Sequence, residues 1–259
     1  MKFSIITICR NDLAGLRLTY NSVINQSYKN YEWIVIDGNS SDGTVEFLKE
    51  LNISNFNFIS EPDKGLYDAM NKGIYRCTGD YMVFMNSGDL FASNETLATL
   101  IKEIKPHTKP LLIYGDSIDY QLDGKKYYRK ARHHNTIYKG MFTQHQSMYF
   151  ATLPKEEQFT YSYSFKYSSD YQFIIKYINL CKKDSDIMKL NIPLSQFQLG
   201  GLNEQRRFVA IREDFQIRKE DLKLHSVKNY TLLVAHYIHT LFKIYTPGFT
   251  KKIRYSQGK

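Results

Sequence analysis

The first 120 residues of the chain alternate between short apolar segments and segments with helical spacing, and this alternation restricts the fold more than any other feature. The apolar segments have strand length and are Phe3–Cys9, Tyr31–Ile36, Phe56–Ile59 and Tyr81–Met85. The helical segments between and after them are Asp12–Ile24, Ser41–Leu51, Tyr67–Tyr75 and Glu95–Ile104. Nearly continuous apolar strands that alternate with helices are typical of a parallel sheet covered on both faces. The sequence therefore predicts an α/β fold.

The pattern changes after Pro110. Two strand-like segments, Leu111–Tyr120 and Lys125–Arg132, flank Asp123-Gly124, which is a hairpin signal. The remaining expected elements are a strand over Gln146–Phe150, a helix over Asp170–Leu180, an extended segment over Leu190–Leu199 and helices over Glu204–Leu224 and Tyr230–Tyr245.

Composition and charge narrow the class of protein. The chain has 259 residues, of which 42% are apolar and 24% charged, and a net charge of +9. The charge favours an anionic partner such as a nucleic acid, a phosphorylated ligand or an acidic membrane surface. The three cysteines are sparse and odd in number, which favours a reducing compartment over a disulfide framework. Polar residues follow the first apolar run too soon for a signal peptide, and no run has the length of a membrane span. We expect a cytoplasmic protein, with peripheral membrane contact left open.

Polar side chains follow each of the first four expected strands. Because ligands of parallel sheets bind beyond the carboxyl ends of the strands, these side chains are expected to gather at one edge. They are Thr7, Arg10 and Asn11 after the first strand, Asp37–Ser40 after the second, Glu61–Gly65 after the third and Asn86–Asp89 after the fourth. A Gly-rich dinucleotide fingerprint and a P-loop motif are both absent. A phosphorylated ligand would then be neutralised by a hard cation held by carboxylates, and Asp89 suits that arrangement.

The motifs FSIITICRND, VIDGNSSDGT, SEPDKGLYDAMNKGI and TGDYMVFMNSGDLF resemble, in order and spacing, those of family two glycosyltransferases with the GT-A fold. The similarity is greatest to bacterial enzymes that build colanic acid, capsules and O-antigens. The resemblance implies a mostly parallel central sheet flanked by helices. It implies a catalytic domain over 1–224, with a nucleotide-binding half at 1–110 and an acceptor half at 111–224. A basic amphipathic helix at 225–259 would extend this domain.

The resemblance also assigns roles to residues of the nucleotide-binding half. It implies that Thr7, with Asn11 nearby, contacts the nucleotide base. It implies that Asp37 binds the base or ribose, and that Asp63 occupies a further nucleotide-side position. Asp42 is better explained as a helix cap. Asn71 and Gly73 could equally serve helix packing, and they are left out of the site.

The MNSGD segment takes the place of the family's D-x-D element, which binds the metal on the donor diphosphate. Asn86 and Gly88 stand where carboxylates are usual, while Asp89 keeps the final carboxylate. The resemblance therefore implies a Mg²⁺ or Mn²⁺ ion held by Asp89, with Asn86 beside the diphosphate and a reduced metal affinity. A plain turn after a strand is the competing explanation.

The acceptor half supplies the expected catalytic base. In relatives it is an Asp or Glu at the start of a helix, and YSSDYQF places Asp170 there. Its alternative is a first-turn carboxylate that stabilises the helix dipole. His145 lies in a family-like H-Q element and would contact the diphosphate or the acceptor, although a lone histidine is more often structural. Gly200-Gly201 matches a loop that closes over the donor, or is a simple turn.

The carboxy-terminal segment combines an apolar helical surface with basic residues and has no acidic residue after Asp221. Such a segment is typical of a helix on an anionic membrane. Packing on the catalytic domain or on a second subunit, as in a homodimer, explains the pattern equally well.

The resemblance thus implies an inverting glycosyltransferase that moves a sugar from a nucleotide diphosphate donor to a saccharide hydroxyl. UDP is the commonest donor nucleotide among relatives, and dTDP and GDP stay open. The acceptor would be a lipid-linked or growing surface polysaccharide. A non-catalytic nucleotide- or sugar-binding subunit is the main alternative. A basic nucleic-acid-binding protein is the second alternative and would explain the charge, but no recognised nucleic-acid-binding module is present, so no nucleic-acid partner is expected.

Overall fold

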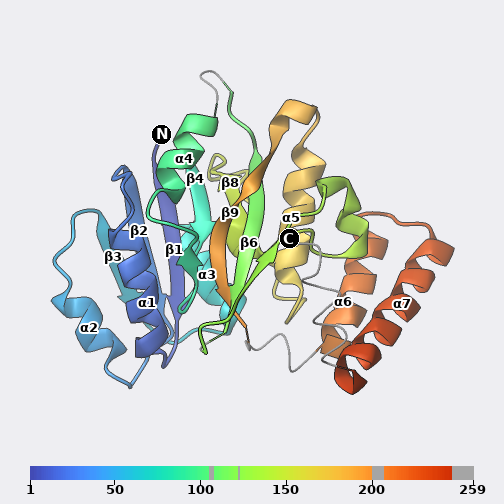
Figure 1. Cartoon of the computed structure of the whole chain (residues 1–259), viewed down its shortest axis with the longest axis horizontal. Coiled ribbons are helices and arrows are strands. Elements are labelled where there is room, and N and C mark those ends of the chain that lie inside the picture. Colours follow the sequence, from blue (N-terminus) through green and yellow to red (C-terminus); the bar gives the residue numbers. More distant parts are fainter. Residues whose placement is uncertain (105–107, 122, 200–206, 247–259) are drawn as a thin grey trace.

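The structure is a computed structural model that describes residues 1–104, 108–121, 123–199 and 207–246. Within these residues the chain forms one nine-stranded sheet with helices on both faces (Figure 1). The strands are β1 (Phe3–Cys9), β2 (Tyr31–Asp37), β3 (Phe56–Ser60), β4 (Tyr81–Phe84), β5 (Leu90–Phe91), β6 (Leu112–Tyr120), β7 (Lys126–Arg129), β8 (Met148–Ala151) and β9 (Ile187–Gln198). The α-helices are α1 (Leu13–Ile24), α2 (Thr44–Glu50), α3 (Leu66–Ile74), α4 (Thr96–Glu103), α5 (Ser169–Leu180), α6 (Arg207–Glu220) and α7 (Ser226–Tyr245).

The strands follow the order β3-β2-β1-β4-β8-β6-β9-β5, and β7 pairs with β6. Strands β1 to β4 are mutually parallel, β8 runs against β4 and β6, and β9 runs with β6. Strands β5 and β7 run against β9 and β6. Strands β1 to β4, β6 and β9 therefore share one direction, so the sheet is mostly parallel, as expected.

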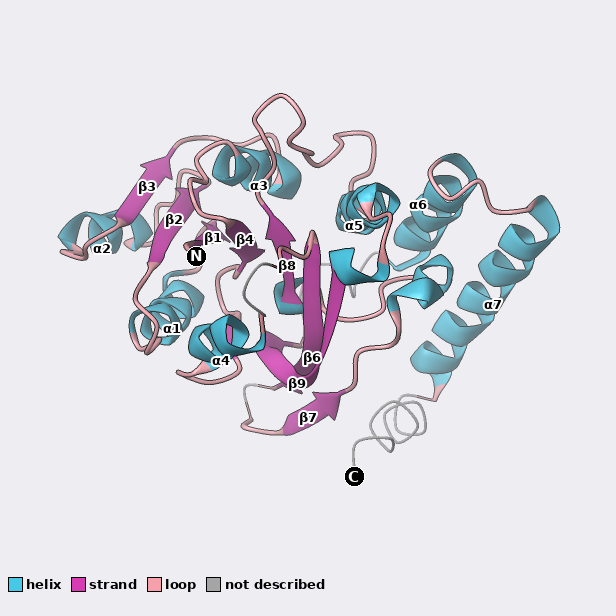
Figure 2. Cartoon of the chain, turned by 90° about the horizontal axis from the view of Figure 1, so that it is seen from above, coloured by secondary structure: helices cyan, strands magenta, loops and turns pink. Residues whose placement is uncertain are grey.

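Two layers of helices cover the sheet because β1, β2 and β4 are apolar on both faces. Helices α1, α2 and α4 pack against one face, around Phe3, Ile5 and Trp33. Helices α3 and α5 pack against the other face, around Ile6 and Phe84. Figure 2 shows these layers from above, with α6 and α7 as an outer pair beyond α5.

The register of the parallel strands aligns their carboxyl ends. Cys9 lies opposite Asp37, and Asp37 lies opposite Ser60. The loops that follow β1, β2 and β3 therefore leave the sheet side by side. This edge is the lower one in Figure 1.

Most expected elements are confirmed, with ends that move by a few residues. The two-residue strand β5 was not predicted, because two residues are too few to show a period. It pairs Leu90 with Gln196 of β9 and so ties the segment after Asp89 to the second half of the sheet. Helix α7 begins at Ser226, four residues before the predicted start. The predicted start of α6 at Glu204, and Gly200-Gly201, lie outside the described residues.

Of the two explanations left open for Asn71 and Gly73, the structure favours helix packing. The Asn71 amide exchanges two hydrogen bonds with the backbone of Tyr161, at 2.7 and 2.9 Å. A Cβ added to Gly73 would lie 2.4 Å from Cγ2 of Ile6, so only glycine lets α3 approach β1 this closely. Cys9, Cys77 and Cys181 are free thiols.

Candidate functional site

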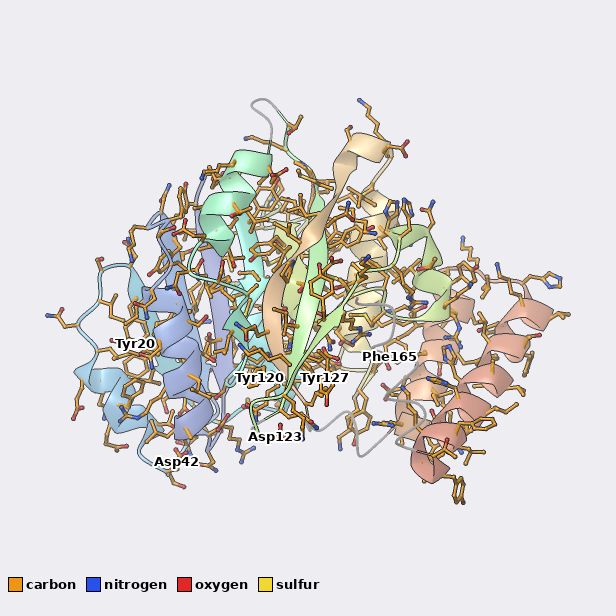
Figure 3. The ribbon with its side chains drawn as sticks, viewed as in Figure 1. Tyr20, Asp42, Tyr120, Asp123, Tyr127 and Phe165 are labelled. Atoms are coloured by element: carbon orange, nitrogen blue, oxygen red, sulfur yellow. The ribbon has the colours of Figure 1, made fainter. Side chains whose placement is uncertain are left out.

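The candidate site lies at the carboxyl edge of the sheet, where the loops after β1, β2 and β3 meet the turn after β4. Asp42, which follows β2, and Tyr120, the last residue of β6, both lie toward this edge in Figure 3. The two halves of the chain therefore contribute to the same edge.

Asp37 organises the loop that follows β2. Its carboxylate is fully buried and accepts hydrogen bonds from the backbone N–H of Ser40 at 3.0 Å, from the Ser40 hydroxyl and from the Ser60 hydroxyl at 2.6 Å. It also accepts a weak hydrogen bond from the Cys9 thiol at 3.6 Å. Asp37 thus holds the β2 and β3 loops together. A direct nucleotide contact would require one of the two serine hydroxyls to move aside, and it stays a prediction.

Asn11 joins the β1 loop to the β2 loop. Its Oδ1 accepts the backbone N–H of Ser41 at 2.8 Å, and its own backbone N–H donates to the Ser40 hydroxyl at 2.7 Å. Asn11 has φ of 50°, a left-handed conformation that asparagine tolerates better than most residues. The side chain is exposed at the loop surface, within reach of a ligand.

Asp63 lies against the β2 loop next to Arg10. A Cβ built on Gly38 would be 2.3 Å from Oδ2 of Asp63 and 3.2 Å from Cδ of Arg10. Glycine at this position therefore lets three loops converge, with the Asp63 carboxylate and the aliphatic part of the Arg10 side chain both next to Gly38. A guanidinium can bind phosphate, and a carboxylate can accept hydrogen bonds from ribose hydroxyls.

Thr7 is placed differently from the expectation. Its side chain is fully buried on the face covered by α1, and its hydroxyl accepts a hydrogen bond from Nε1 of Trp33 at 2.9 Å. Because β1 continues for two residues beyond Thr7, this side chain belongs to the core and does not reach the edge. The nucleotide contact expected of Thr7 is not favoured by this geometry.

The turn after β4 is held from three sides. The Thr19 hydroxyl of α1 donates to the backbone oxygens of Asn86 and Asp89, at 3.1 and 2.9 Å, and accepts the N–H of Gly88 at 3.0 Å. The Tyr120 hydroxyl donates to the Gly88 carbonyl. The Ser87 hydroxyl donates to the carboxylate of Asp12 at 2.7 Å. Side chains from α1 and β6 therefore fix the conformation of this turn.

Gly88 explains part of the departure from a D-x-D sequence. Its φ is 88°, where side-chain-bearing residues are strained, and a Cβ would lie 2.8 Å from Oε1 of Gln198. The second carboxylate of a D-x-D element would therefore meet both backbone strain and the Gln198 side chain here.

Asp89 is the buried carboxylate of the turn, with only 4% of its surface exposed. Its Oδ2 accepts a hydrogen bond from Nε2 of Gln146 at 2.7 Å. Burial raises the pKa of Asp89 to about 7, and hydrogen bonds from Gln146 and from the backbone of Asn86 and Gln198 counteract this rise. A cation beside the carboxylate would restore its charged form.

The residues of the turn suit a hard divalent cation. Within the described part of the chain, no group of three or more His, Cys, Asp or Glu residues forms a complete metal site. The buried Oδ1 of Asn86 has no hydrogen-bond partner among the described residues, and Asp89 supplies a carboxylate three residues later. One carboxylate, one amide oxygen and ligand phosphates make an oxygen set of the kind that Mg²⁺ accepts.

His145 does not reach the candidate site. Its ring is 6% exposed, stacks on Phe84 with 4.9 Å between ring centroids and shares a hydrogen bond of 2.8 Å with the Tyr161 hydroxyl. Burial lowers the pKa of His145 to about 3, so the ring is neutral. The structural alternative therefore describes His145 in this structure, and its neighbour Gln146 is the residue that contacts Asp89.

Asp170 lies in the first turn of α5, as expected, and is half-buried. Its Oδ1 accepts a long hydrogen bond of 3.4 Å from the Tyr67 hydroxyl of α3. Tyr67 stacks on Tyr161, whose ring contacts Phe84 at the end of β4. Burial raises the pKa of Asp170 to about 6. Asp170 is thus a carboxylate whose pKa lies near neutrality, linked through aromatic rings to Phe84, the last residue of β4, which leads into the turn with Asp89.

Glu213 of α6 completes the surroundings of Asp170. Its carboxylate accepts the backbone N–H groups of Lys166, Tyr167 and Ser168, at 2.9, 2.8 and 2.9 Å. These three donors precede the first turn of α5, so Glu213 fixes the segment that presents Asp170. The negative charge of Glu213 also contributes to the raised pKa of Asp170.

Sequence reasoning missed Gln146, Gln198, Tyr120 and Glu213, which lie far along the chain from the groups they contact. The Gln146 position within the H-Q element was a usable signal, while the other three carry none. The structural role expected of Asp42 is confirmed: Oδ1 accepts the Thr44 N–H at the start of α2, and Oδ2 accepts the Leu13 N–H at the start of α1.

Comparison with known proteins places the chain in a family. Residues 4–171 match the model of glycosyl transferase family 2. A protein described as an uncharacterized glycosyltransferase from Mycobacterium tuberculosis strain H37Rv is 29% identical over 216 residues, covering 82% of this chain and 81% of that protein. A PGL/p-HBAD biosynthesis glycosyltransferase from Mycobacterium bovis strain BCG is 33% identical over 119 residues, which cover 45% of this chain and 46% of that protein.

Solved structures share the fold. The TarS 1–349 fragment of S. aureus aligns with a TM-score of 0.63 at 19% identity, and the alignment covers 94% of this chain and 72% of the TarS chain. The same fragment has also been solved with UDP and with UDP-GlcNAc. The mannosyltransferase PcManGT from Pyrobaculum calidifontis was solved with GDP-Man and Mn²⁺. It aligns with a TM-score of 0.64 at 14% identity, and the alignment covers 92% of this chain and 69% of the PcManGT chain. The GT-A fold is thereby confirmed. The chain belongs to glycosyl transferase family 2 and is a glycosyltransferase.

Proposed function

We propose that this protein is an inverting glycosyltransferase that transfers a sugar from a nucleotide diphosphate donor to a hydroxyl of a surface polysaccharide, either growing or lipid-linked. The observation that carries the proposal is Asp170. It is a half-buried carboxylate with a pKa raised to about 6, beside the Tyr67 hydroxyl and joined through Tyr161 and Phe84 to the Asn86–Asp89 turn. A carboxylate with a pKa near neutrality can accept a proton and release it again.

The donor would bind over the first 110 residues. Asn11, Asp63 and Arg10 border the converging loops, and Asp37 keeps two of those loops in place. UDP is the first choice of nucleotide because TarS, which shares this fold, has been solved with UDP and UDP-GlcNAc. GDP is the second choice, since PcManGT was solved with GDP-Man.

Asp89 and the Oδ1 of Asn86 would hold a Mg²⁺ or Mn²⁺ ion, a proposal supported by the Mn²⁺ in the PcManGT structure. Such an ion would offset the negative charge that develops on a departing diphosphate. The chain itself contributes the buried turn, in which Thr19 and Tyr120 fix the backbone around Asp89.

The proposed reaction is a single displacement. Asp170 takes the proton of the acceptor hydroxyl while the acceptor oxygen forms a bond to the anomeric carbon. The bond between that carbon and the diphosphate oxygen breaks, and the nucleoside diphosphate leaves with the bonding electrons. Attack from the face opposite the leaving group inverts the anomeric configuration. The acceptor would lie over residues 111–224, beyond Asp170, and the basic extension at 225–259 would keep the enzyme near the inner face of the membrane.

The test measures thermal stability with UDP, GDP and dTDP, each with and without Mn²⁺ or Mg²⁺, in wild type, Asp89→Ala and Asp123→Ala. Asp123 is an exposed hairpin residue and serves as the control. The matching nucleotide should raise the midpoint by mass action in a metal-dependent manner, and only Asp89→Ala should lose the effect. A midpoint that responds to none of the nucleotides would contradict the donor site.

Asp170→Asn separates an enzyme from a binding subunit. Donor turnover should fall by about 10²- to 10⁴-fold, the usual contribution of a general base, while the nucleotide-dependent midpoint shift stays as in wild type. Nucleotide binding without turnover in wild type, tested with a range of saccharide acceptors, would favour the non-catalytic alternative.

A further inference from the structure

Helix α7 buries polar side chains and exposes apolar ones, whereas an ordinary surface helix does the reverse. Over its length the two buried side chains are polar, Asn229 at 1% and Thr240 at 6% exposure. Asn229 attaches α7 to α6, because its Oδ1 accepts a hydrogen bond from Nε of the buried Arg218 at 2.8 Å and its Nδ2 donates to the Phe215 carbonyl at 3.0 Å. The helix is therefore held to the protein by polar contacts as well as by ring contacts from Tyr230 and Tyr237.

Six apolar side chains of α7 form an exposed row, and one of them, Tyr230, is 59% exposed although its ring also contacts Phe215. Their spacing of three and four residues places them on one side of the helix. We call this row the outer stripe; its members are Val227, Tyr230, Val234, Ile238, Leu241 and Tyr245, with exposures of 69%, 59%, 55%, 49%, 43% and 78%. Single exposed apolar residues are normal on proteins, but a contiguous patch along a whole helix indicates an interaction surface.

The charge around the outer stripe distinguishes among partners. After Asp221 the chain has no acidic residue and seven basic ones: Lys223, Lys228, Lys243, Lys251, Lys252, Arg254 and Lys259. A second copy of the chain docked on the same stripe would add an equal positive charge and no complementary negative charge, because a two-fold interface is made of the same patch on both copies. A bilayer of anionic lipids complements both features, because its acyl chains match the apolar stripe and its headgroups match the positive charge.

Among the described residues, none of the helices has the length and apolarity needed to cross a membrane. A helix with an apolar face and a basic surround binds instead in the plane of the bilayer interface. Helix α7 forms the outermost layer of the protein beyond α6, and its carboxyl end lies on the side to which the parallel strands point (Figures 1 and 2).

We propose that the outer stripe of α7 docks on an anionic lipid bilayer. The stripe would enter the interface between headgroups and acyl chains, and the positive charge that the chain carries after Asp221 would attract the anionic headgroups. This placement deepens the proposed function, on which it rests for its purpose, because it would bring the carboxyl edge of the sheet close to lipid-linked acceptors. The docking itself requires neither donor nor acceptor and can be measured without them.

The test is co-sedimentation of the full chain with vesicles of phosphatidylcholine, with and without phosphatidylglycerol. Wild type should bind the anionic vesicles and lose that binding as salt is raised, since screening weakens charge attraction. The double variant Val234→Glu/Ile238→Glu should bind them at least about tenfold more weakly, because it puts two negative charges on the stripe. Val209→Glu, at an exposed position of α6 outside the stripe, is the matched control and should bind as wild type.

Three results would overturn the proposal. One is equal binding of wild type to anionic and neutral vesicles, or to neither. Another is a double variant that binds anionic vesicles as tightly as wild type. The third is a wild-type dimer in lipid-free buffer that the double variant converts to a monomer, which would assign the stripe to a second copy. The nucleotide-dependent midpoint shift of the double variant should equal that of wild type, so failure of the docking and failure of the donor site are read separately.

Discussion

Gln146 donates a hydrogen bond from Nε2 to Oδ2 of Asp89 at 2.7 Å, and both side chains are buried, at 5% and 4% exposure. The contact joins the turn after β4 to the residues that lead into β8, and so links the two halves of the chain at the candidate donor site. It also supplies a donor that favours the ionised form of Asp89 against the effect of burial. Gln146 is thus a residue through which the protein controls the charge of its proposed metal ligand.

Replacing Gln146 with leucine tests this control. The variant leaves the Asp89 carboxylate buried without its side-chain donor, which should destabilise the protein by about 1–3 kcal/mol above about pH 7, where the carboxylate is ionised. The metal-dependent shift in thermal midpoint with nucleotide should shrink at the same time. Gln158→Leu is the control of equal size, since Gln158 is half-buried and contacts Leu153 and Tyr177 instead. Equal losses of the metal-dependent shift in both variants would contradict the role of Gln146.

Substitution by aspartate should have different effects on metal affinity and stability at Asn86 and at Gly88. The Asn86 Oδ1 is buried without a partner among the described residues, and the Asp89 N–H donates to the Asn86 carbonyl at 2.9 Å, so Asn86→Asp places a second carboxylate in the same turn as Asp89. It should tighten Mn²⁺ binding severalfold. Gly88→Asp adds a side chain at φ of 88°, beside Oε1 of Gln198, and should cost about 1–3 kcal/mol of unfolding free energy without a gain in metal affinity. Isothermal titration with Mn²⁺ and chemical unfolding measure the two effects. A Gly88→Asp variant that is stable and binds metal more tightly would show that this turn geometry is wrong.

The raised pKa of Asp89 predicts a pH dependence of stability. The ordinary pKa of the carboxyl is 3.8 and burial raises it to about 7. Between these values the folded protein keeps a proton that the unfolded chain has lost, so the contribution of Asp89 to stability falls as pH rises and levels off above about pH 7. Asp89→Asn removes this loss, and its midpoint should gain more relative to wild type at about pH 8 than at about pH 5. Thermal unfolding of ligand-free protein at both pH values checks the sign. Saturating Mn²⁺ and nucleotide should stabilise wild type alone, and most strongly at the higher pH.

The order of strands and helices could be predicted from the sequence, because each strand in the first half is a continuous apolar run and each helix shows helical spacing of its apolar residues. Phe3–Cys9 is predicted and observed with the same bounds, since an apolar run bounded by Arg10 and Asn11 leaves little freedom. The carboxyl edge could be predicted for the same reason, because polar residues end each of these strands. Strand β5 could not, since its two residues are specified by their partners Gln196 and Ser195.

The direction of individual side chains was less accessible. Thr7 and Trp33 lie 26 residues apart, and only the register of β1 and β2 brings the hydroxyl to the indole nitrogen. His145 and Gln146 are adjacent and polar, and the fold turns one toward Phe84 and the other toward Asp89. Sequence patterns locate such residues at the edge of the sheet, whereas packing decides which of them reaches the site.

Glu213 gives the last prediction, because it acts on Asp170 from another helix. Its carboxylate holds the N–H groups of Lys166, Tyr167 and Ser168, and its charge helps to raise the pKa of Asp170. Glu213→Gln keeps an acceptor oxygen but removes the charge, so the pKa of Asp170 should fall. The acidic limb of the profile of kcat/KM against pH, which reports ionisation of the free base, should move to lower pH. A lower pKa also makes Asp170 a weaker base, so the plateau should fall as well.

Glu220→Gln is the control, because Glu220 lies exposed on the same helix and accepts a hydrogen bond from Gln216. It should leave the limb in place. A purely structural role for Glu213 would lower the thermal midpoint and the plateau but leave the position of the limb unchanged, and a limb that moves to higher pH would contradict the proposed charge effect. A shift to lower pH in Glu213→Gln alone would show that α6 adjusts the base through the charge it places at the start of α5.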